Sequence, residues 1–251
     1  MASRIKKQRL FWALIDDSEV WIMINLPLTL NPETVAYWFF RLNGCSTIPN
    51  FVVHPDRRGS QRTDVDVLAV RFPHRAELLT SGDPMPDHPV FNSDGRIDII
   101  FAEVKHGLCR LNGPWTHPAD ENMQRVLYAV GAFDLSRVVE VAQALYEEGR
   151  YQDDIYRVRL FAVGDRVNDA ILPAAVQLVW NEILAFIFDR LTRYQAQKAH
   201  HGQWDSTGKH LYDLASRCTQ KEFVDTVRAR MQTHVDAQQL ARQNPGVENH
   251  G

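Results

Sequence analysis

The chain has 251 residues, of which 45% are hydrophobic and 24% are charged, and its formal net charge at pH 7 is −3. This composition is typical of a globular protein with one large or two small domains, and it excludes fibrous and disordered proteins. The slightly acidic balance gives no overall signature of a nucleic-acid binder. No apolar stretch approaches the 20 residues that a membrane span needs, so we expect no membrane partner.

The cysteines and the first residues indicate a cytoplasmic protein. Cys45, Cys109 and Cys218 lie far apart without C-x-x-C spacing. They therefore predict neither a disulfide framework nor a zinc site, and they fit a reducing compartment. Within residues 1–20 the apolar run before two aspartates is six residues long, which is too short for a signal peptide.

The first predicted helix covers residues 31–44. Asn31 is placed as its N-cap, Pro32 suits its first turn, and Gly44 follows its last apolar residue as a C-cap would. Three predicted strands follow, at residues 50–55, 63–72 and 96–107. Residues 73–95, between the last two strands, are rich in Pro, Gly and Asp and are predicted to form a long irregular excursion.

The second half of the chain alternates between helical and strand patterns. Apolar spacing predicts helices at 118–133 and 134–149, strands at 154–164 and 175–180, and helical structure from Asn181 nearly to the end. This order predicts an α/β domain over residues 1–180, with a mixed central sheet flanked by helices. A helical C-terminal extension over 181–251 is expected to pack on this core, because no linker separates the two.

The stretch TDVDVLAV, residues 63–70, opens an apolar strand with two carboxylates. Asp64 and Asp66 share one face with Leu68 and Val70, and both faces are otherwise apolar, which favours a central strand. Two carboxylates about 4 Å apart repel by roughly 4 kcal/mol at an effective dielectric constant near 20. The pair therefore needs a cation, a proton or a basic partner.

The third strand ends with an acid and a base on one face, Glu103 and Lys105. If the second and third strands pair antiparallel, Asp66 lies beside both of them. Three carboxylates, counting Asp64, and one ammonium would then converge at one end of the sheet. Such a cluster predicts an oxygen-rich site for Mg²⁺ with room for waters and a phosphate. A metal-free salt bridge between Asp66 and Lys105 is the alternative.

Over residues 31–165 this ordered set resembles the PD-(D/E)xK, or restriction-endonuclease-like, nucleases. Their shared pattern is an acidic helix, an Asp opening the second core strand, an E-x-K ending the third, and a following helix. Asp66 in TDVDVLAV matches the aspartate, and Glu103 and Lys105 in FAEVKHG match E-x-K. The helix acid would be Glu33, which precedes Gly44 much as the first-helix glutamate of Holliday-junction resolvases precedes the glycine that ends its helix.

A further motif lies on the predicted helix after the third strand. Gln124 and Tyr128 in QRVLY are similar to the Q-x-x-x-Y motif of the RecB-type branch of this superfamily. The resemblance implies that these two side chains support the site or touch the substrate backbone. A half-buried packing pair at helical spacing is the alternative.

The resemblance implies a restriction-endonuclease-like core and metal-dependent hydrolysis of phosphodiester bonds, with DNA as the expected substrate. Asp66 and Glu103, with the Val104 carbonyl, would hold Mg²⁺, and Mn²⁺ is an alternative ion. Lys105 would position or deprotonate the attacking water and stabilise negative charge. Glu33 would complete a second metal site or orient a water.

Two departures from the family pattern leave alternatives open. The excursion at 73–95 is longer than the usual hairpin, and no Pro-Asp precedes the site, so Asp64 could be the ligand instead of Asp66. The basic segment before the second strand could meet flanking phosphates or could be a solvated loop. Its arginines are Arg57, Arg58 and Arg62.

Two rival functions remain. The first is a catalytically inactive nuclease fold that serves as a nucleic-acid or protein binding module. The second is a structural interaction protein whose working surface is the helical region from Asn181 onward. The sequence also leaves open whether the chain forms a homodimer or binds partner proteins.

Overall fold

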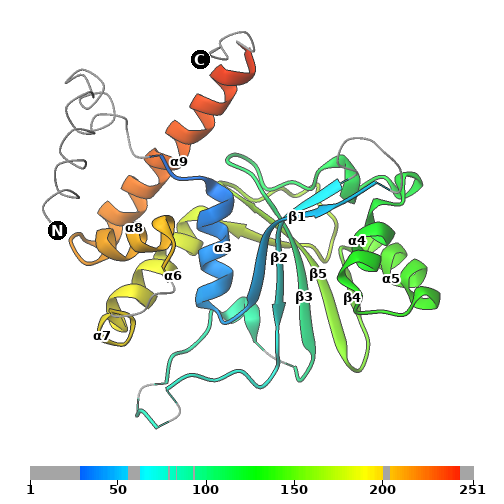
Figure 1. The fold of residues 1–251 in the computed structure, drawn as a ribbon, viewed down its shortest axis with the longest axis horizontal. Helices are drawn as coiled ribbons and strands as arrows, with labels where there is room; N and C mark the ends of the chain where they lie inside the picture. The colour runs from blue at the N-terminus through cyan, green and yellow to red at the C-terminus, as the bar shows by residue number, and fades with distance from the viewer. Residues whose placement is uncertain are drawn as a thin grey trace, which may run out of the picture.

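A mixed β-sheet with helices on both faces forms the centre of the protein (Figure 1). The structure, a computed structural model, describes residues 29–55, 63–78, 80–82, 84–92, 94–199 and 204–243. In this part of the chain the sheet has six strands. Its order is β1 (Ser46–Val53), β2 (Thr63–Arg71), β3 (Ile97–Val104), β5 (Tyr156–Gly164) and β4 (Arg150–Gln152), and β6 (Val176–Val179) also pairs with β5. The predicted α/β fold with a mixed sheet flanked by helices is confirmed.

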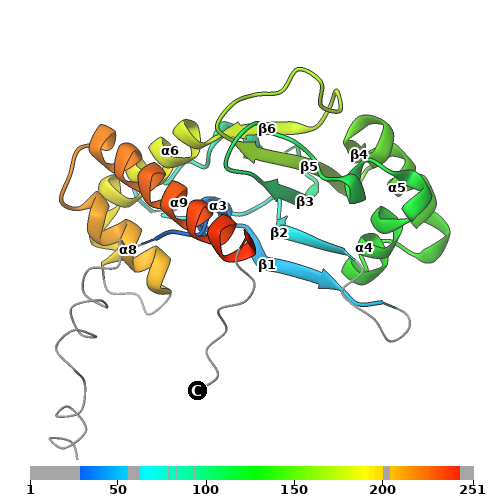
Figure 2. The same ribbon diagram turned by 90° about the horizontal axis from the view of Figure 1, so that it is seen from above.

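The helices form two layers, one on each face of the sheet (Figures 1 and 2). One layer contains α3 (Pro32–Leu42), α6 (Trp180–Arg193), α8 (Ser206–Ala215) and α9 (Gln220–Gln243), and the other contains α4 (Asn122–Val130) and α5 (Leu135–Glu148). Each layer buries its own apolar cluster against the strands. The short elements are α7 (Gln195–Lys198) and the 3-10 turns η2 (Pro89–Phe91), η3 (Gly113–Trp115) and η4 (Pro118–Asp120).

The first helix forms where the sequence places it. The Asn31 side chain accepts a hydrogen bond from the Glu33 amide at 2.9 Å, and Pro32 occupies the first turn. Gly44 follows the helix with a φ of +74°, a conformation that glycine adopts without strain. These caps fix Glu33 in the first turn of α3, at the end of the helix where a carboxylate interacts favourably with the helix dipole.

Strand β2 lies between β1 and β3, as its two apolar faces predict. It pairs antiparallel with β3, with Val67 opposite Ala102 and Leu68 opposite Phe101. The long excursion between the strands is therefore compatible with hairpin pairing.

Buried ion pairs anchor this excursion to the body of the protein. Asp87 accepts from Arg71 at 2.6 Å and from Arg75 at 2.7 Å, and Arg190 of α6 lies 3.4 Å from the same carboxylate. Because the three arginines come from β2, the excursion and α6, one carboxylate joins the loop to two elements of the core.

Several elements differ from the sequence-based prediction, and three of the differences have a local cause. Strand β1 begins at Ser46 and not at residue 50, because Pro49 is tolerated on an edge strand. Helix α4 begins at Asn122 because Glu121 has a φ of +54°, which separates the helix from the 3-10 turn before it. The short strand β4 was not predicted, and it follows the turn in which Gly149 ends α5 with a φ of +80°.

The C-terminal helices share a core with the sheet. Ile183 of α6 and Val227 of α9 belong to the same buried cluster as Val67 of β2 and Phe161 of β5. Gly208 of α8 packs so closely on the Trp38 ring that an added Cβ atom would lie 2.1 Å from it. Among the described residues no helix is both long enough and apolar enough to cross a membrane.

Candidate functional site

Asp66 lies where β2 and β3 separate. The last paired residues of this ladder are Val67 and Ala102. One position further, the Asp66 carboxylate oxygen Oδ2 accepts the Val104 amide N–H at 2.7 Å. The carboxylate thus satisfies a backbone donor that the ladder no longer pairs, and this contact holds Asp66 beside the end of β3.

Lys105 joins the two carboxylates of the site. Its Nζ forms an ion pair with Glu103 Oε1 and lies 3.6 Å from Asp66 Oδ2. The structure therefore brings Asp66, Glu103 and Lys105 together, as antiparallel pairing of the strands predicts. Of the two aspartates, Asp66 makes these contacts, while Asp64 acts on the site through its charge.

The Glu103 carboxylate, which is only 3% exposed, is held by Asn112 and Trp115, which both follow β3 in the sequence. The Trp115 indole N–H donates to Glu103 Oε2 at 2.7 Å, and the Asn112 amide donates to Oε1. The Trp115 ring stacks on Phe101 with 6.2 Å between ring centroids, which fixes its orientation. Sequence reasoning missed Asn112 and Trp115 because no residue spacing ties them to Glu103.

The carboxylates of the site lie close to one another in a partly buried environment, and their pKa values are raised. Burial, and then the charge of Asp66, raises the pKa of Glu103 to about 7, although Lys105 and the Trp115 hydrogen bond act in the opposite direction. Burial also raises the pKa of Asp66. The pKa of Glu33 in α3 is raised by burial and then by the negative charge of Asp66, so Glu33 interacts electrostatically with this cluster.

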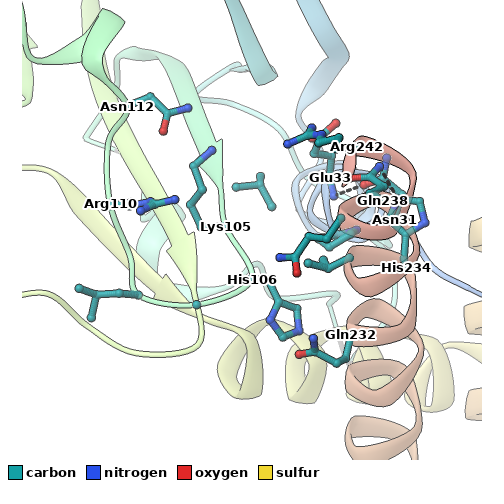
Figure 3. Close-up of a pocket in the computed structure, with 16 residues that line it drawn as sticks. Asn31, Glu33, Lys105, His106, Arg110, Asn112, Gln232, His234, Gln238 and Arg242 are labelled. Atoms are coloured by element: carbon teal, nitrogen blue, oxygen red, sulfur yellow. Dashed lines mark hydrogen bonds between the residues drawn. The ribbon is translucent and has the colours of Figure 1, made fainter. Parts of the chain in front are cut away.

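Of the cluster, Lys105 lines a cleft of about 700 Å³ (Figure 3). Its walls are the start of α3 with Glu33, the segment 104–112 with Lys105, and the second half of α9. In Figure 3 the Lys105 side chain extends between the loop that carries Asn112 and the wall formed by α3 and α9. Glu33 and Lys105 therefore face one shared space from two different elements.

Close packing against β5 positions the loop after β3. The Cys109 amide donates to the Arg166 carbonyl at 2.8 Å. Gly164 ends β5 directly beneath the loop, where an added Cβ atom would lie only 2.6 Å from the Gly107 carbonyl oxygen. A glycine is therefore needed at this position for the loop to carry Lys105 and Asn112 to the cleft.

Gln124 and Tyr128 have no hydrogen bond or ion pair with Asp66, Glu103 or Lys105 in the described part of the chain. Gln124 lines a separate cavity of about 300 Å³ with residues of α5, and Tyr128 is 43% exposed. Their proposed role stays a prediction.

The basic residues predicted to contact substrate cannot be placed. Arg57, Arg58 and Arg62 lie outside the described residues. Residues 1–20, which are predicted not to form a signal peptide, also lie outside them. Their roles also stay predictions.

Comparisons of this chain with protein-family models, with curated proteins and with solved structures give no match. The chemistry of the site therefore rests on its own residues. One buried and one half-buried carboxylate, an ammonium that forms ion pairs with both, and a third carboxylate that lines the cleft beside this ammonium form a compact acid–base cluster. Such a cluster can hold a cation, orient a water and exchange a proton.

The raised pKa of Glu103 predicts a pH-dependent contribution to stability. A glutamate pKa of about 7 in the folded protein, against 4.5 ordinarily, means that the folded state binds more protons between these values. The contribution is complete below pH 4.5 and is lost as the pH rises through about 7. We expect the free energy of unfolding of wild type, relative to Glu103→Gln, to fall between pH 5 and pH 8 in metal-free buffer, as measured by urea denaturation.

The matched control for this measurement is Glu140→Gln, which changes an exposed glutamate of α5. If the difference in free energy of unfolding between wild type and Glu140→Gln also falls between pH 5 and pH 8, the effect does not come from burial of Glu103. A difference between wild type and Glu103→Gln that stays constant from pH 5 to pH 8 would contradict the assignment.

Proposed function

We propose that this protein is a metal-dependent nuclease with a restriction-endonuclease-like core, which hydrolyses phosphodiester bonds in DNA. One observation supports the proposal most strongly. A single cationic atom, Lys105 Nζ, reaches both Asp66 and Glu103 at the point where two core strands separate. An acid pair at one end of a sheet, joined by a lysine that lines a cleft, is an arrangement that suits metal-dependent hydrolysis of phosphodiester bonds.

The donor set fits a hard divalent cation with few protein ligands. No three Asp, Glu, His or Cys side chains of the described residues surround one point. Mg²⁺ commonly uses one or two carboxylates and keeps several waters. Asp66 and Glu103 are two such carboxylates, and Val104, which lies between Glu103 and Lys105 in the sequence, adds a main-chain carbonyl oxygen. These residues would hold Mg²⁺ or Mn²⁺.

Each side chain has a separate task in the proposed reaction. A bound ion would supply positive charge that stabilises the phosphate in the transition state. The Lys105 ammonium can hydrogen-bond the attacking water and the developing negative charge. Glu33, whose pKa is raised, faces the same cleft and can accept a proton from a water there. Trp115 and Asn112 keep the Glu103 carboxylate in a fixed orientation.

One observation favours the rival binding module. Both oxygens of Glu103 already accept hydrogen bonds or an ion pair from within the protein, namely from Trp115, Asn112 and Lys105. A carboxylate that is satisfied in this way can be purely structural. The binding module predicts that nucleic-acid binding survives removal of divalent ions and yields no cleaved product.

The test is incubation of wild-type protein with labelled single- and double-stranded DNA and RNA, in Mg²⁺, in Mn²⁺ and in EDTA. The nuclease predicts products that appear with the ions and disappear with EDTA. Binding of the same oligonucleotides without any product, and unchanged by EDTA, would establish the binding module instead.

Replacing Trp115 by phenylalanine is expected to lower the cleavage rate by about 10- to 100-fold. The change keeps the ring that stacks on Phe101 but removes the N–H that Glu103 Oε2 accepts. Initial rates at saturating Mg²⁺ measure the effect, and Trp204→Phe, which changes a tryptophan outside the cleft lining, is the control. Equal rates for wild type and Trp115→Phe would show that the hydrogen bond does not position Glu103.

A further inference from the structure

The second half of α9 forms one wall of the cleft that Lys105 enters (Figure 3). The lining residues of this helix are Gln232, His234, Val235, Gln238, Gln239 and Arg242. They recur at intervals of three and four residues, so they lie on one side of the helix. A segment about 130 residues after Lys105 in the sequence thus faces the same space.

This half of α9 is not held by the apolar core. The buried residues of the helix are Phe223, Val227 and Met231, at intervals of four. Beyond Met231 no described residue of α9 is buried, and Leu240 is 60% exposed. The last three turns therefore leave the hydrophobic layer and run beside the cleft. Packing alone does not account for the polar face that they present there.

The lining of the cleft carries three cationic side chains, Lys105, Arg110 and Arg242, against one carboxylate, Glu33, and this balance favours an anionic ligand. Arg110 and Arg242 lie on opposite sides of it in Figure 3, one on the loop after β3 and one on α9. Neither forms an ion pair with a described residue. The carboxylates of α9, which are Glu222, Asp225 and Asp236, are absent from the lining. In a chain of net charge −3, two walls that carry cations without an ion-pair partner among the described residues are a specific feature.

The remaining lining and the size of the cleft narrow the ligand class. The amides of Asn112, Gln238 and Gln239 can each donate and accept hydrogen bonds, which suits bases and sugars as well as phosphates. A volume of about 700 Å³ is in the range of cavities that enclose a drug-sized molecule. A cleft of this size suits an unpaired nucleotide, whose base edges are free to hydrogen-bond with these amides, whereas the Watson–Crick edges of a duplex are already paired.

We propose that single-stranded nucleic acid passes between the loop after β3 and the second half of α9, with its phosphates contacted by Arg110 and Arg242. This inference rests on the proposed nuclease function, and it assigns the substrate form and the second wall of the site. Helix α9 is then a substrate-binding arm, and the bases meet the amide side chains on its inner face.

The test measures binding of a labelled single-stranded oligonucleotide by fluorescence anisotropy in EDTA, over a series of salt concentrations. Arg242→Ala is expected to raise Kd about tenfold. It is also expected to reduce the slope of log K against log salt by about 0.7, the value for one phosphate contact on a single strand. Lys221→Ala, at an exposed lysine of α9 outside the cleft, is the matched control and should change neither quantity. A duplex of the same sequence should bind more weakly than the single strand.

Three outcomes would overturn the inference. If Arg242→Ala leaves Kd and the salt slope unchanged while wild type still cleaves, α9 does not bind the substrate but the nuclease function stands. If the duplex binds as tightly as the single strand, the assigned substrate form is wrong. If wild type neither binds nor cleaves any nucleic acid, the proposed function falls, and this inference falls with it.

Discussion

Replacing Lys105 by alanine is expected to lower metal-dependent cleavage by about 10²- to 10⁴-fold, the range typical for loss of a positioned acid–base group. Its ammonium forms ion pairs with both Asp66 and Glu103, and Lys105 lines the cleft. Initial cleavage rates at saturating Mg²⁺ measure the change. Lys105→Arg keeps the charge but not the compact ammonium, so it should restore only part of the rate.

The control for this experiment is Lys209→Ala, which removes a lysine that is 71% exposed and forms an ion pair with Asp213 one turn along its own helix. Its cleavage rate should equal that of wild type. Thermal unfolding of each variant shows whether a loss of rate is a loss of fold. Retention of most of the cleavage rate by a folded Lys105→Ala protein would exclude Lys105 from the reaction.

Replacing Asp98 by alanine is expected to lower the free energy of unfolding by about 3–5 kcal/mol. The Asp98 side chain is 2% exposed, and it accepts hydrogen bonds from both Arg157 and Arg159 of the neighbouring strand. Its removal leaves two guanidinium groups in the sheet without their main partner, and a buried charge without a partner is costly. Urea denaturation measures the change.

The comparison is with Asp213→Ala, which breaks a largely exposed pair with Lys209 one helical turn away. That change should cost less than about 0.5 kcal/mol. If Asp98→Ala costs no more than Asp213→Ala, the buried arginines have other compensation, and Asp98 does not stabilise the pairing of β3 with β5.

The elements that local chemistry specifies could be predicted from the sequence. Asn31, Pro32 and Gly44 mark both ends of α3, and the apolar faces of β2 identify a central strand. Strand β4 could not be predicted, because three residues carry no periodic pattern and their pairing depends on β5. The start of α4 depends on the left-handed conformation of Glu121, which the residue type does not reveal.

The same distinction applies to the candidate site. The proximity of Asp66, Glu103 and Lys105 could be predicted from the sequence, because side chains alternate between the two faces along each of two paired strands. Trp115 reaches Glu103 through a loop, and Arg242 reaches the cleft through a helix that follows the whole sheet in the sequence. Contacts of this kind depend on tertiary packing, and no local pattern encodes them.

The central claim is that Asp66 and Glu103 share one divalent cation. Isothermal titration of Mg²⁺ into wild type and into Glu103→Gln at pH 8 tests it most directly. We predict binding of one ion by wild type and at least a tenfold loss of affinity in the variant, because metal-site changes of this kind commonly cost 10- to 100-fold. Equal binding by the two proteins, or no binding by wild type, would contradict the claim.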